Sequence, residues 1–160
     1  MENNRLYLKT PDKDELWYRI KLLGDADTMS FNPGGCYHIT QEQAAEWYDL
    51  WIGVPGKFYA YITLSDDNTF VGEVNVHFDA DTGLHMVGII IEESQKGKGY
   101  AEEALRLLAK YAFNEMKLDK IADKFPATRI AAEKIFTKVG FVRQGDDLLV
   151  LKKADFETAI

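Results

Sequence analysis

The stretch that decides the fold is VGIIIEESQKGKGYAEEALRLL, residues 87–108. It opens with the apolar residues of a buried strand and passes through a short turn that contains Gly97 and Gly99. It then continues as an amphipathic helix, expected from about Gly99 to Met116. The first turn of a helix leaves backbone N–H groups without partners inside the helix, and small residues let an anion approach them. The stretch therefore predicts a strand, an anion-binding turn and a helix.

Two lysines, Lys96 and Lys98, add positive charge to this turn. A plain strand-to-helix connection with solvated lysines is the alternative interpretation. Two common phosphate motifs fit poorly, because Glu102 stands where a dinucleotide fingerprint needs its third glycine and no Gly-Lys-Ser/Thr ending is present. From the residues of the turn alone, an anion site and a plain connection therefore both stay open.

Elements of both kinds are expected on either side of this stretch. Before it we expect a strand at residues 5–9, a helix capped by Thr10 that ends at Gly24, an irregular segment at 25–39 and a helix capped by Thr40 that ends near Gly53. Alternating runs at residues 58–64, 69–78 and 84–91 predict an antiparallel meander. After it we expect a strand at 119–124, a helix at 128–139 and a hairpin of 141–144 with 148–152. The fold class is α+β, with a mixed, mainly antiparallel sheet flanked by helices.

The composition indicates one domain over residues 1–160, since 160 residues of which 46% are hydrophobic supply one core. The net charge of −7 argues against nucleic acid as a partner. The longest apolar run, Met86 to Ile91, is too short to span a membrane, and the N-terminus has no apolar signal core, so we expect a cytoplasmic protein. Cys36 is the single cysteine and excludes an internal disulfide.

The stretch at residues 87–108 resembles the central motif of the GNAT superfamily of acyl-CoA-dependent N-acyltransferases. In that motif a strand runs into Arg/Gln-x-x-Gly-x-Gly/Ala and a helix, and the match here is Lys96-x-x-Gly99-x-Ala101. A second segment, RIAAEKIFTKVGF at residues 129–141, resembles the next helix of the family and its closing Lys-x-Gly-Phe. The two motifs stand in the family's order, and the order of elements matches over nearly the whole chain.

This resemblance implies acetyl-CoA as co-substrate and assigns residues to it. The backbone of Ile89, Ile90 and Ile91 would hydrogen-bond the pantetheine arm as another strand would. The pyrophosphate would lie on the turn and first helical residues, which are Lys96, Gly97, Lys98, Gly99, Tyr100, Ala101 and Glu102. Arg129 and Phe136 on the second motif would complete the cofactor site.

Three of these positions depart from the family pattern. Lys96 stands where Arg or Gln is usual and keeps the charge without a planar fork. Arg129 stands where Asn is common, and would reach a phosphate or remain solvated. Phe136 stands where a Tyr often acts as general acid, and a phenyl ring cannot donate a proton. The resemblance therefore predicts the cofactor more firmly than the acid.

An acceptor amine needs a base, because an amine of pKa about 10.4 costs about 4.6 kcal/mol to deprotonate near pH 7. In the strand at residues 69–78, strict alternation puts Val71 on the face of Glu73 and Phe70 on the other face. A symmetric turn at residues 79–83 would then pair Glu73 with Ile89, beside the expected pantetheine arm. Glu73 is thus the first candidate base, although a solvent-facing glutamate is the alternative.

The same register would place His77 opposite His85, and His85 is the second candidate base. His77 with Asp79 could in principle supply metal ligands. No third ligand stands at a recognisable spacing, so we expect no metal site.

The predicted function is direct transfer of an acetyl group from acetyl-CoA to a primary amine, with the acceptor walls at residues 31–37 and 47–51. A small-molecule or peptide amine is the expected partner: a polyamine, an amino sugar, a protein N-terminus or a lysine side chain. No membrane partner is expected, and a homodimer remains open. The alternatives are a non-catalytic CoA-binding module of the same fold and a nucleotide-binding domain that prefers a dinucleotide.

Overall fold

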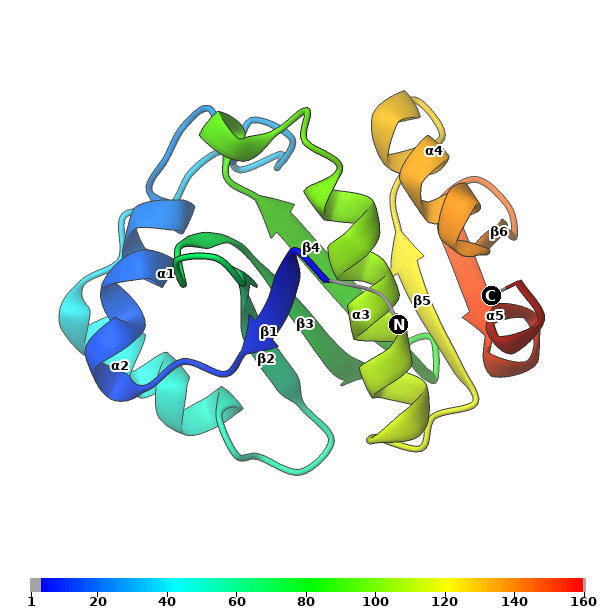
Figure 1. Ribbon diagram of the computed structural model, residues 1–160, viewed down its shortest axis with the longest axis horizontal. Coiled ribbons are helices and arrows are strands. Elements are labelled where there is room, and N and C mark those ends of the chain that lie inside the picture. Colours follow the sequence, from blue (N-terminus) through cyan, green and yellow to red (C-terminus); the bar gives the residue numbers. More distant parts are fainter. Residues whose placement is uncertain (1–3, 160) are drawn as a thin grey trace.

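A seven-stranded mixed sheet with the order β1-β2-β3-β4-β5-β7-β6 runs through the computed structural model, which describes residues 4–159 (Figure 1). The strands are β1 (Leu6–Lys9), β2 (Phe58–Leu64), β3 (Phe70–Asp79), β4 (Leu84–Ile91), β5 (Lys120–Lys124), β6 (Val142–Arg143) and β7 (Leu148–Lys152). The helices are α1 (Leu16–Leu23), α2 (Gln41–Trp51), α3 (Tyr100–Asn114), α4 (Ile130–Val139) and α5 (Lys153–Ala159), with 3₁₀ turns η1 (Lys13–Glu15) and η2 (Glu93–Gln95). All strand pairs are antiparallel except β4 with β5. The predicted α+β class and mixed sheet are confirmed.

Local patterns located most elements correctly. β2 and β4 have the predicted bounds, and Thr40 caps α2 by accepting from the Gln43 N–H while the Gln43 side chain accepts from the Thr40 N–H. The prediction that Thr10 caps the first helix is wrong. Its hydroxyl donates instead to the Tyr59 carbonyl at 3.3 Å, which keeps the chain on the edge of β2, and the first helical turn begins at Lys13. The short helix α5 was not predicted.

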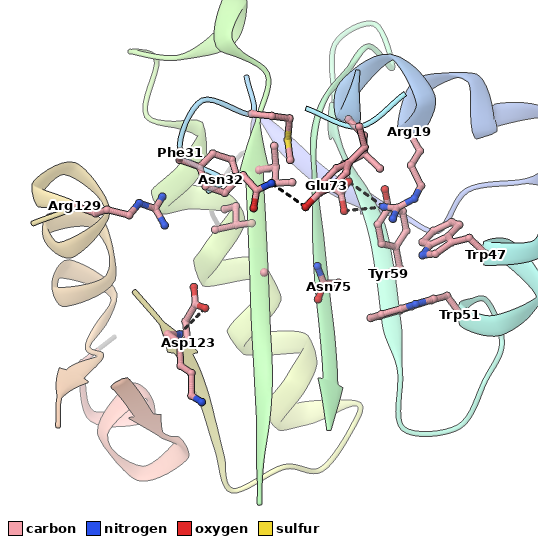
Figure 2. Close-up of a pocket in the computed structure, with 17 residues that line it drawn as sticks. Arg19, Phe31, Asn32, Trp47, Trp51, Tyr59, Glu73, Asn75, Asp123 and Arg129 are labelled. Atoms are coloured by element: carbon pink, nitrogen blue, oxygen red, sulfur yellow. Dashed lines mark hydrogen bonds and ion pairs between the residues drawn. The ribbon is translucent and has the colours of Figure 1, made fainter. Parts of the chain in front are cut away.

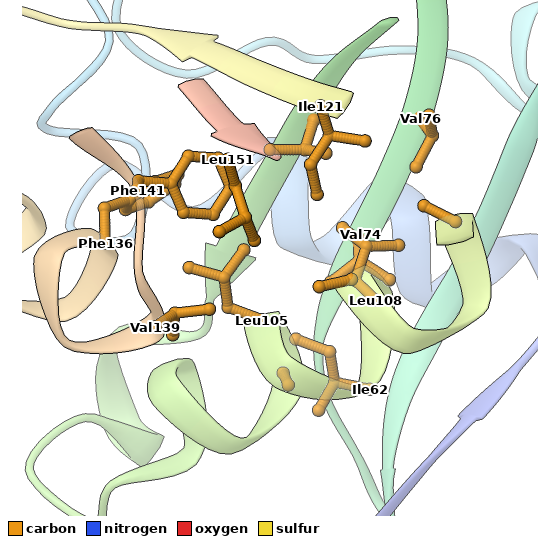
Figure 3. Packing of buried hydrophobic residues seen from close by; sticks show 14 of the residues in the cluster. Ile62, Val74, Val76, Leu105, Leu108, Ile121, Phe136, Val139, Phe141 and Leu151 are labelled. Atoms are coloured by element: carbon orange, nitrogen blue, oxygen red, sulfur yellow. The ribbon is translucent and has the colours of Figure 1, made fainter. Parts of the chain in front are cut away.

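Helices cover both faces of the sheet. On one face, α3, α4 and α5 pack with the sheet in the largest core cluster, in which Leu105 and Leu108 of α3 lie over Val74 and Val76 of β3 (Figure 3). On the other face, α1 and α2 pack over a smaller cluster rich in aromatic residues, centred on Tyr18, Tyr59 and Tyr61 with Leu22. The two faces thus carry different side chains, aliphatic under α3 and aromatic under α1 and α2.

A β-bulge corrects the predicted faces of β3. Ile62 pairs with Gly72 and Thr63 with Phe70, so Val71 is the extra residue. A bulge reverses the alternation on one side of it. Val71 therefore joins the core under α3, and Phe70 packs on the aromatic cluster, the reverse of what strict alternation predicted.

The register between β3 and β4 also differs from the prediction by one residue. Glu73 pairs with Ile90, His77 with Met86 and Phe78 with His85. The cause is the turn, which closes at the Asp79–Leu84 pair because the Asp79 carboxylate accepts from the backbone N–H and hydroxyl of Thr82. Since a one-residue shift moves a side chain to the other face, His85 does not share a face with Glu73.

None of the helices in residues 4–159 combines the length and apolar character needed to cross a bilayer.

Candidate active site

The site begins where β4 and β5 separate. These two strands pair only at Met86 and Ala122, and beyond that pair β4 continues to Ile91 with β3 on one side alone. Backbone N–H and C=O groups of β4 that point toward β5 after this pair therefore have no strand partner in the described residues. The gap offers an edge to which an extended ligand can add as a strand does.

A cavity of about 430 Å³, here called the turn cavity, lies beside this edge. Its walls come from the end of β4, the turn before α3, the end of β5 and the first two turns of α4. The lining residues are Thr28, Phe31, Ile89, Ile90, Ile91, Gln95, Lys96, Gly97, Gly99, Tyr100, Ala101, Glu102, Asp123, Phe125, Arg129, Ala131, Ala132, Ile135 and Phe136. All predicted cofactor residues line this cavity except Lys98.

The turn exposes backbone to the cavity. Gly97 and Gly99 have φ of 82° and 80°, in the left-handed region where other residues are strained. Gly99 is also the N-cap of α3, so no side chain caps the first N–H groups of that helix. These groups and the helix dipole favour an anion at this end of the cavity.

Charged residues around the turn hold its shape. Arg5 at the start of the chain donates to the Lys98 carbonyl at 2.9 Å and pairs with Glu103 at 2.9 Å. The ammonium of Lys98 donates to the side chain of Gln95, and Lys98 itself is not among the lining residues. Lys96 lines the cavity and pairs with Glu93 at 2.7 Å. Of the two lysines predicted to serve the anion, Lys96 is the one that lines the cavity.

A second cavity of about 340 Å³, here called the aromatic cavity, is lined by residues on both sides of β4 (Figure 2). It is built from side chains of α1, the segment 25–39, α2 and strands β2 to β5. The lining residues are Arg19, Leu23, Met29, Phe31, Asn32, Tyr37, Trp47, Trp51, Tyr59, Glu73, Asn75, Gly88, Ile89, Ile90, Asp123, Lys124 and Arg129. The segments 31–37 and 47–51 both contribute, as the sequence predicted.

Glu73 lies in this cavity as half of a buried ion pair. Arg19 donates to both carboxylate oxygens, at 3.1 and 3.3 Å, and only 3% of Glu73 is exposed (Figure 2). The Arg19 guanidinium stacks on Trp47, with its Cζ atom 3.9 Å from the ring centroid. The ring of Tyr59 also lies against this guanidinium. Burial raises the pKa of Glu73, whereas the charge of Arg19 lowers it. The carboxylate predicted as a base is therefore held by a guanidinium.

Asp123 is the other carboxylate of this cavity, and no sequence pattern pointed to it. It lies at the end of β5, where it accepts a hydrogen bond from the Lys124 N–H at 2.7 Å. Burial raises the pKa of Asp123 to about 7, while that hydrogen bond and the charge of Arg129 act in the opposite direction.

His85, the second candidate base, lies elsewhere. It faces Phe78, with ring centroids 5.2 Å apart, and it is absent from the lining of both cavities. Within residues 4–159, His77 and Asp79 belong to no three-residue group with metal-ligand geometry; His77 packs on Trp51 instead. The sole such group there consists of exposed Asp12 and Asp14 with half-buried Glu15, and Asp12 and Glu15 pair with Lys9.

The two cavities adjoin along β4. Five residues line both of them: Phe31, Ile89, Ile90, Asp123 and Arg129. A ligand in the turn cavity and a ligand in the aromatic cavity would therefore meet beside Ile89 and Ile90.

Sequence reasoning missed several side chains of the aromatic cavity, namely Arg19, Tyr59, Asn75, Gly88 and Asp123. They come from five separate elements. A motif would not reveal them, although the single arginine in an otherwise apolar face of α1 is a signal in retrospect.

Comparison with known proteins agrees with this architecture. Residues 5–142 match the family described as "Acetyltransferase (GNAT) domain". The probable N-acetyltransferase YjcK of Bacillus subtilis (strain 168) is 29% identical over 89 residues, which cover 54% of this chain and 49% of that protein. The chain thus spans about half the length of this curated relative.

Solved structures share the fold over almost the whole chain. Spermidine N-acetyltransferase from Vibrio cholerae, in complex with CoA and spermine, has a TM-score of 0.82 at 19% identity and covers 97% of this chain and 99% of its own. AAC(6')-Ib, in complex with ribostamycin and coenzyme A, has a TM-score of 0.79 at 18% identity, with 96% and 97% covered. The acyltransferase prediction is confirmed at the level of the family: the chain belongs to the GNAT acetyltransferase family.

Proposed function

We propose that this protein is an N-acetyltransferase that moves an acetyl group from acetyl-CoA to a primary amine. The observation that carries the proposal is the meeting of the two cavities at Ile89 and Ile90. Transfer between two substrates requires their reacting atoms to approach within about 3–3.5 Å, and adjoining cavities allow this without a covalent enzyme intermediate.

Acetyl-CoA would occupy the turn cavity. Its pyrophosphate would lie against the N–H groups of residues 97–102, and its pantetheine arm along the open edge of Ile89–Ile91. Lys96 and Arg129 supply positive charge there, and Phe136 supplies an apolar wall. Solved proteins of this fold hold CoA, which supports the same ligand here. The arm would bring the thioester to the end of the cavity shared with the aromatic side.

The acceptor amine would occupy the aromatic cavity. There it attacks the thioester carbonyl, the carbon–sulfur bond breaks, and CoA leaves as a thiolate, while the amine gives up its proton to a base. Backbone N–H groups of β4 would stabilise the oxyanion. Trp47, Trp51 and Tyr59 offer aromatic faces to the body of the acceptor.

The charges of this cavity favour an acceptor with a single amine. Arg19, Lys124 and Arg129 outnumber Glu73 and Asp123, and the carboxylate of Glu73 is already neutralised by Arg19. A polyamine would bring several positive charges to a wall that is not acidic. We therefore propose a monoamine, such as a peptide N-terminus or an arylalkylamine, in preference to a polyamine.

The test is an assay of thiol release from acetyl-CoA with four acceptors: spermidine, ribostamycin, a peptide with a free N-terminus, and phenethylamine. Turnover with at least one is expected, with either monoamine ahead of spermidine. A thermal shift with acetyl-CoA but no turnover on any amine would favour the non-catalytic CoA-binding module. A larger shift with NAD than with acetyl-CoA would favour the nucleotide-binding domain. A cytoplasmic location and a homodimer stay predictions.

A further inference from the structure

Asp123 occupies the place where the two proposed substrates would meet. It is one of the five residues that line both cavities, and the sole carboxylate among those five. Figure 2 shows it on β5 across the gap from β4, on the side of the gap that faces Arg129. The strands diverge just before it, because their single residue pair is Met86 with Ala122. Its carboxylate therefore borders the end of the turn cavity and the floor of the aromatic cavity at once.

The carboxylate of Asp123 has fewer hydrogen-bond and ion-pair partners than the carboxylate of Glu73. The Asp123 carboxylate accepts a hydrogen bond from the backbone N–H of Lys124, and within residues 4–159 it has no ion pair closer than 4.0 Å. Glu73, by contrast, accepts two hydrogen bonds from Arg19. A proton placed on Glu73 would leave a buried guanidinium without its counter-charge, whereas a proton placed on Asp123 breaks no ion pair.

We propose that Asp123 is the proton acceptor for the attacking amine. The inference rests on the proposed function. An N–H bond of the bound ammonium breaks and its proton moves to an Asp123 oxygen, the neutral amine attacks the carbonyl carbon, and the carbon–sulfur bond breaks as the thiolate leaves. The amide nitrogen loses its second proton to solvent, and Asp123 can return its own to the thiolate, so no further donor is needed where Phe136 offers none.

The basicity of Asp123 suits this role, since burial raises its pKa to about 7 and a base works best when its pKa is near the working pH. Charged groups surround it from every element that shares its cavities. They are Lys124 on β5, Arg129 before α4, the Arg19–Glu73 pair across β4, and Lys96 and Glu102 on the turn and α3. Of these, the charge of Arg129 is the one that lowers the pKa of Asp123.

The test is the pH profile of kcat/KM for the best alkylamine acceptor of the four-compound panel, in the wild type and in Asp123→Asn. The peptide is left out, because its α-amino group has a pKa of about 7.7–8.0 and is partly neutral at pH 7.5. With Asp123 as base, the wild type reacts with the ammonium form and its profile rises to a plateau from near pH 7. Without it, only the neutral amine reacts, and an amine of pKa about 10.4 is about 0.1% neutral at pH 7.5. The variant should therefore be slower by about 10²-fold or more at pH 7.5, with no plateau below about pH 10.

Asp119→Asn is the matched control, since Asp119 is exposed, just precedes β5 and lines neither cavity. It should keep the wild-type profile, and Asp123→Glu should recover part of the loss with its plateau intact. A plateau that persists in Asp123→Asn, or a rate loss explained by weaker acetyl-CoA binding, would overturn the inference while the proposed function stands. A wild type that acetylates no amine would overturn both.

Protein stability gives a readout that needs no acceptor. The folded-state pKa of Asp123, about 7, lies above the ordinary aspartate pKa of 3.8, so between these pH values the folded protein holds a proton that the unfolded protein has lost. The contribution of Asp123 to stability therefore falls as pH rises through this window. The Tm of Asp123→Asn minus that of the wild type should grow from pH 5 to pH 8, and a difference that is constant with pH would contradict a buried, titrating carboxylate.

Discussion

The turn cavity and the aromatic cavity share one wall but are built in different ways. The turn cavity is lined mainly by two stretches of chain, residues 89–102 and 123–136. The aromatic cavity is lined by residues from eight different parts of the fold between Arg19 and Arg129. A site of the first kind depends on local conformation, and a site of the second kind depends on register and packing. Substitutions should therefore affect them differently.

The largest effect is expected at the turn. Gly99→Glu should abolish the thermal stabilisation by acetyl-CoA and with it the activity, because Gly99 has a φ of 80° and a carboxylate there would oppose the pyrophosphate. At a hundredfold excess over Kd, wild-type protein should gain about 2.7 kcal/mol, or roughly 5–10 °C in Tm.

Gly83→Glu is the control for backbone strain, since Gly83 has a φ of 70° in the turn between β3 and β4 and lines neither cavity. It should lose some stability and keep its response to acetyl-CoA. An undiminished shift in Gly99→Glu would remove the turn from the cofactor site.

The next largest effect is expected from substitutions in the aromatic cavity, which should lower activity without changing acetyl-CoA affinity. Glu73→Gln should lower kcat/KM for the amine by about 10²-fold with acetyl-CoA affinity nearly unchanged, because it leaves buried Arg19 without its counter-charge. Arg19→Gln removes the other partner and should cost a similar factor. If Glu73 were the base, only Glu73→Gln would lose the plateau in the pH profile, and that result would restore the role predicted from the sequence.

Substitutions at two glycines test whether the wall that β4 forms between the two cavities can be altered for one substrate without affecting the other. A Cβ at Gly72 would lie 2.2 Å from the Ile90 carbonyl oxygen, so Gly72→Ala must shift β4 where both cavities meet. KM should rise about tenfold for acetyl-CoA and for the amine. A Cβ at Gly88 would meet the end of the Asn75 side chain at 2.5 Å, which can move away within the aromatic cavity.

Gly88→Ala should therefore raise KM for the amine alone. Steady-state kinetics with each substrate varied would separate the two patterns, and an equal rise for both substrates in Gly88→Ala would show that the cavities are coupled through β4.

The smallest effect is expected at Phe136. Phe136→Tyr should change kcat by no more than about tenfold, since a thiol of pKa about 8.5 leaves as thiolate near pH 7 at a cost of roughly 2 kcal/mol, against about 4.6 kcal/mol for the amine. Phe136 packs between Phe125 and Phe141, with ring centroids at 5.0 and 4.8 Å. A gain of 10²-fold or more in pre-steady-state rate would show that protonation of the leaving group limits the native enzyme.

The difference between the cavities also explains what could be predicted from the sequence. The turn at Gly97 and Gly99 and the strand before it are contiguous, so their pattern located the wall that β4, the turn and the start of α3 contribute to the turn cavity. Asp123 and Arg19 lie 104 positions apart and meet only through the sheet and α1, so no local pattern connects them.

Single-residue irregularities account for the errors in placing side chains. The bulge at Val71 and the turn held by Asp79 each shift the alternation by one, which exchanged Phe70 with Val71 and removed His85 from the face of Glu73. The alternation of apolar residues predicts that a strand is present, but it does not determine how that strand pairs with its neighbour. A cap pattern is ambiguous in the same way. Thr10 matches the residue pattern of a helix cap, but its hydroxyl donates to a backbone carbonyl of β2.

The contact between Arg5 and the turn would make the edge of the sheet part of the proposed cofactor site. Arg5 precedes β1, the outermost strand, and ties it to the Lys98 carbonyl and to Glu103 on α3. Linkage is reciprocal. If an ordered turn strengthens acetyl-CoA binding, bound acetyl-CoA stabilises the turn and the β1 strand tied to it by the same free energy. Amide hydrogens of Leu6 to Lys9 should then exchange more slowly with solvent deuterium when the cofactor is bound, although that strand lines neither cavity.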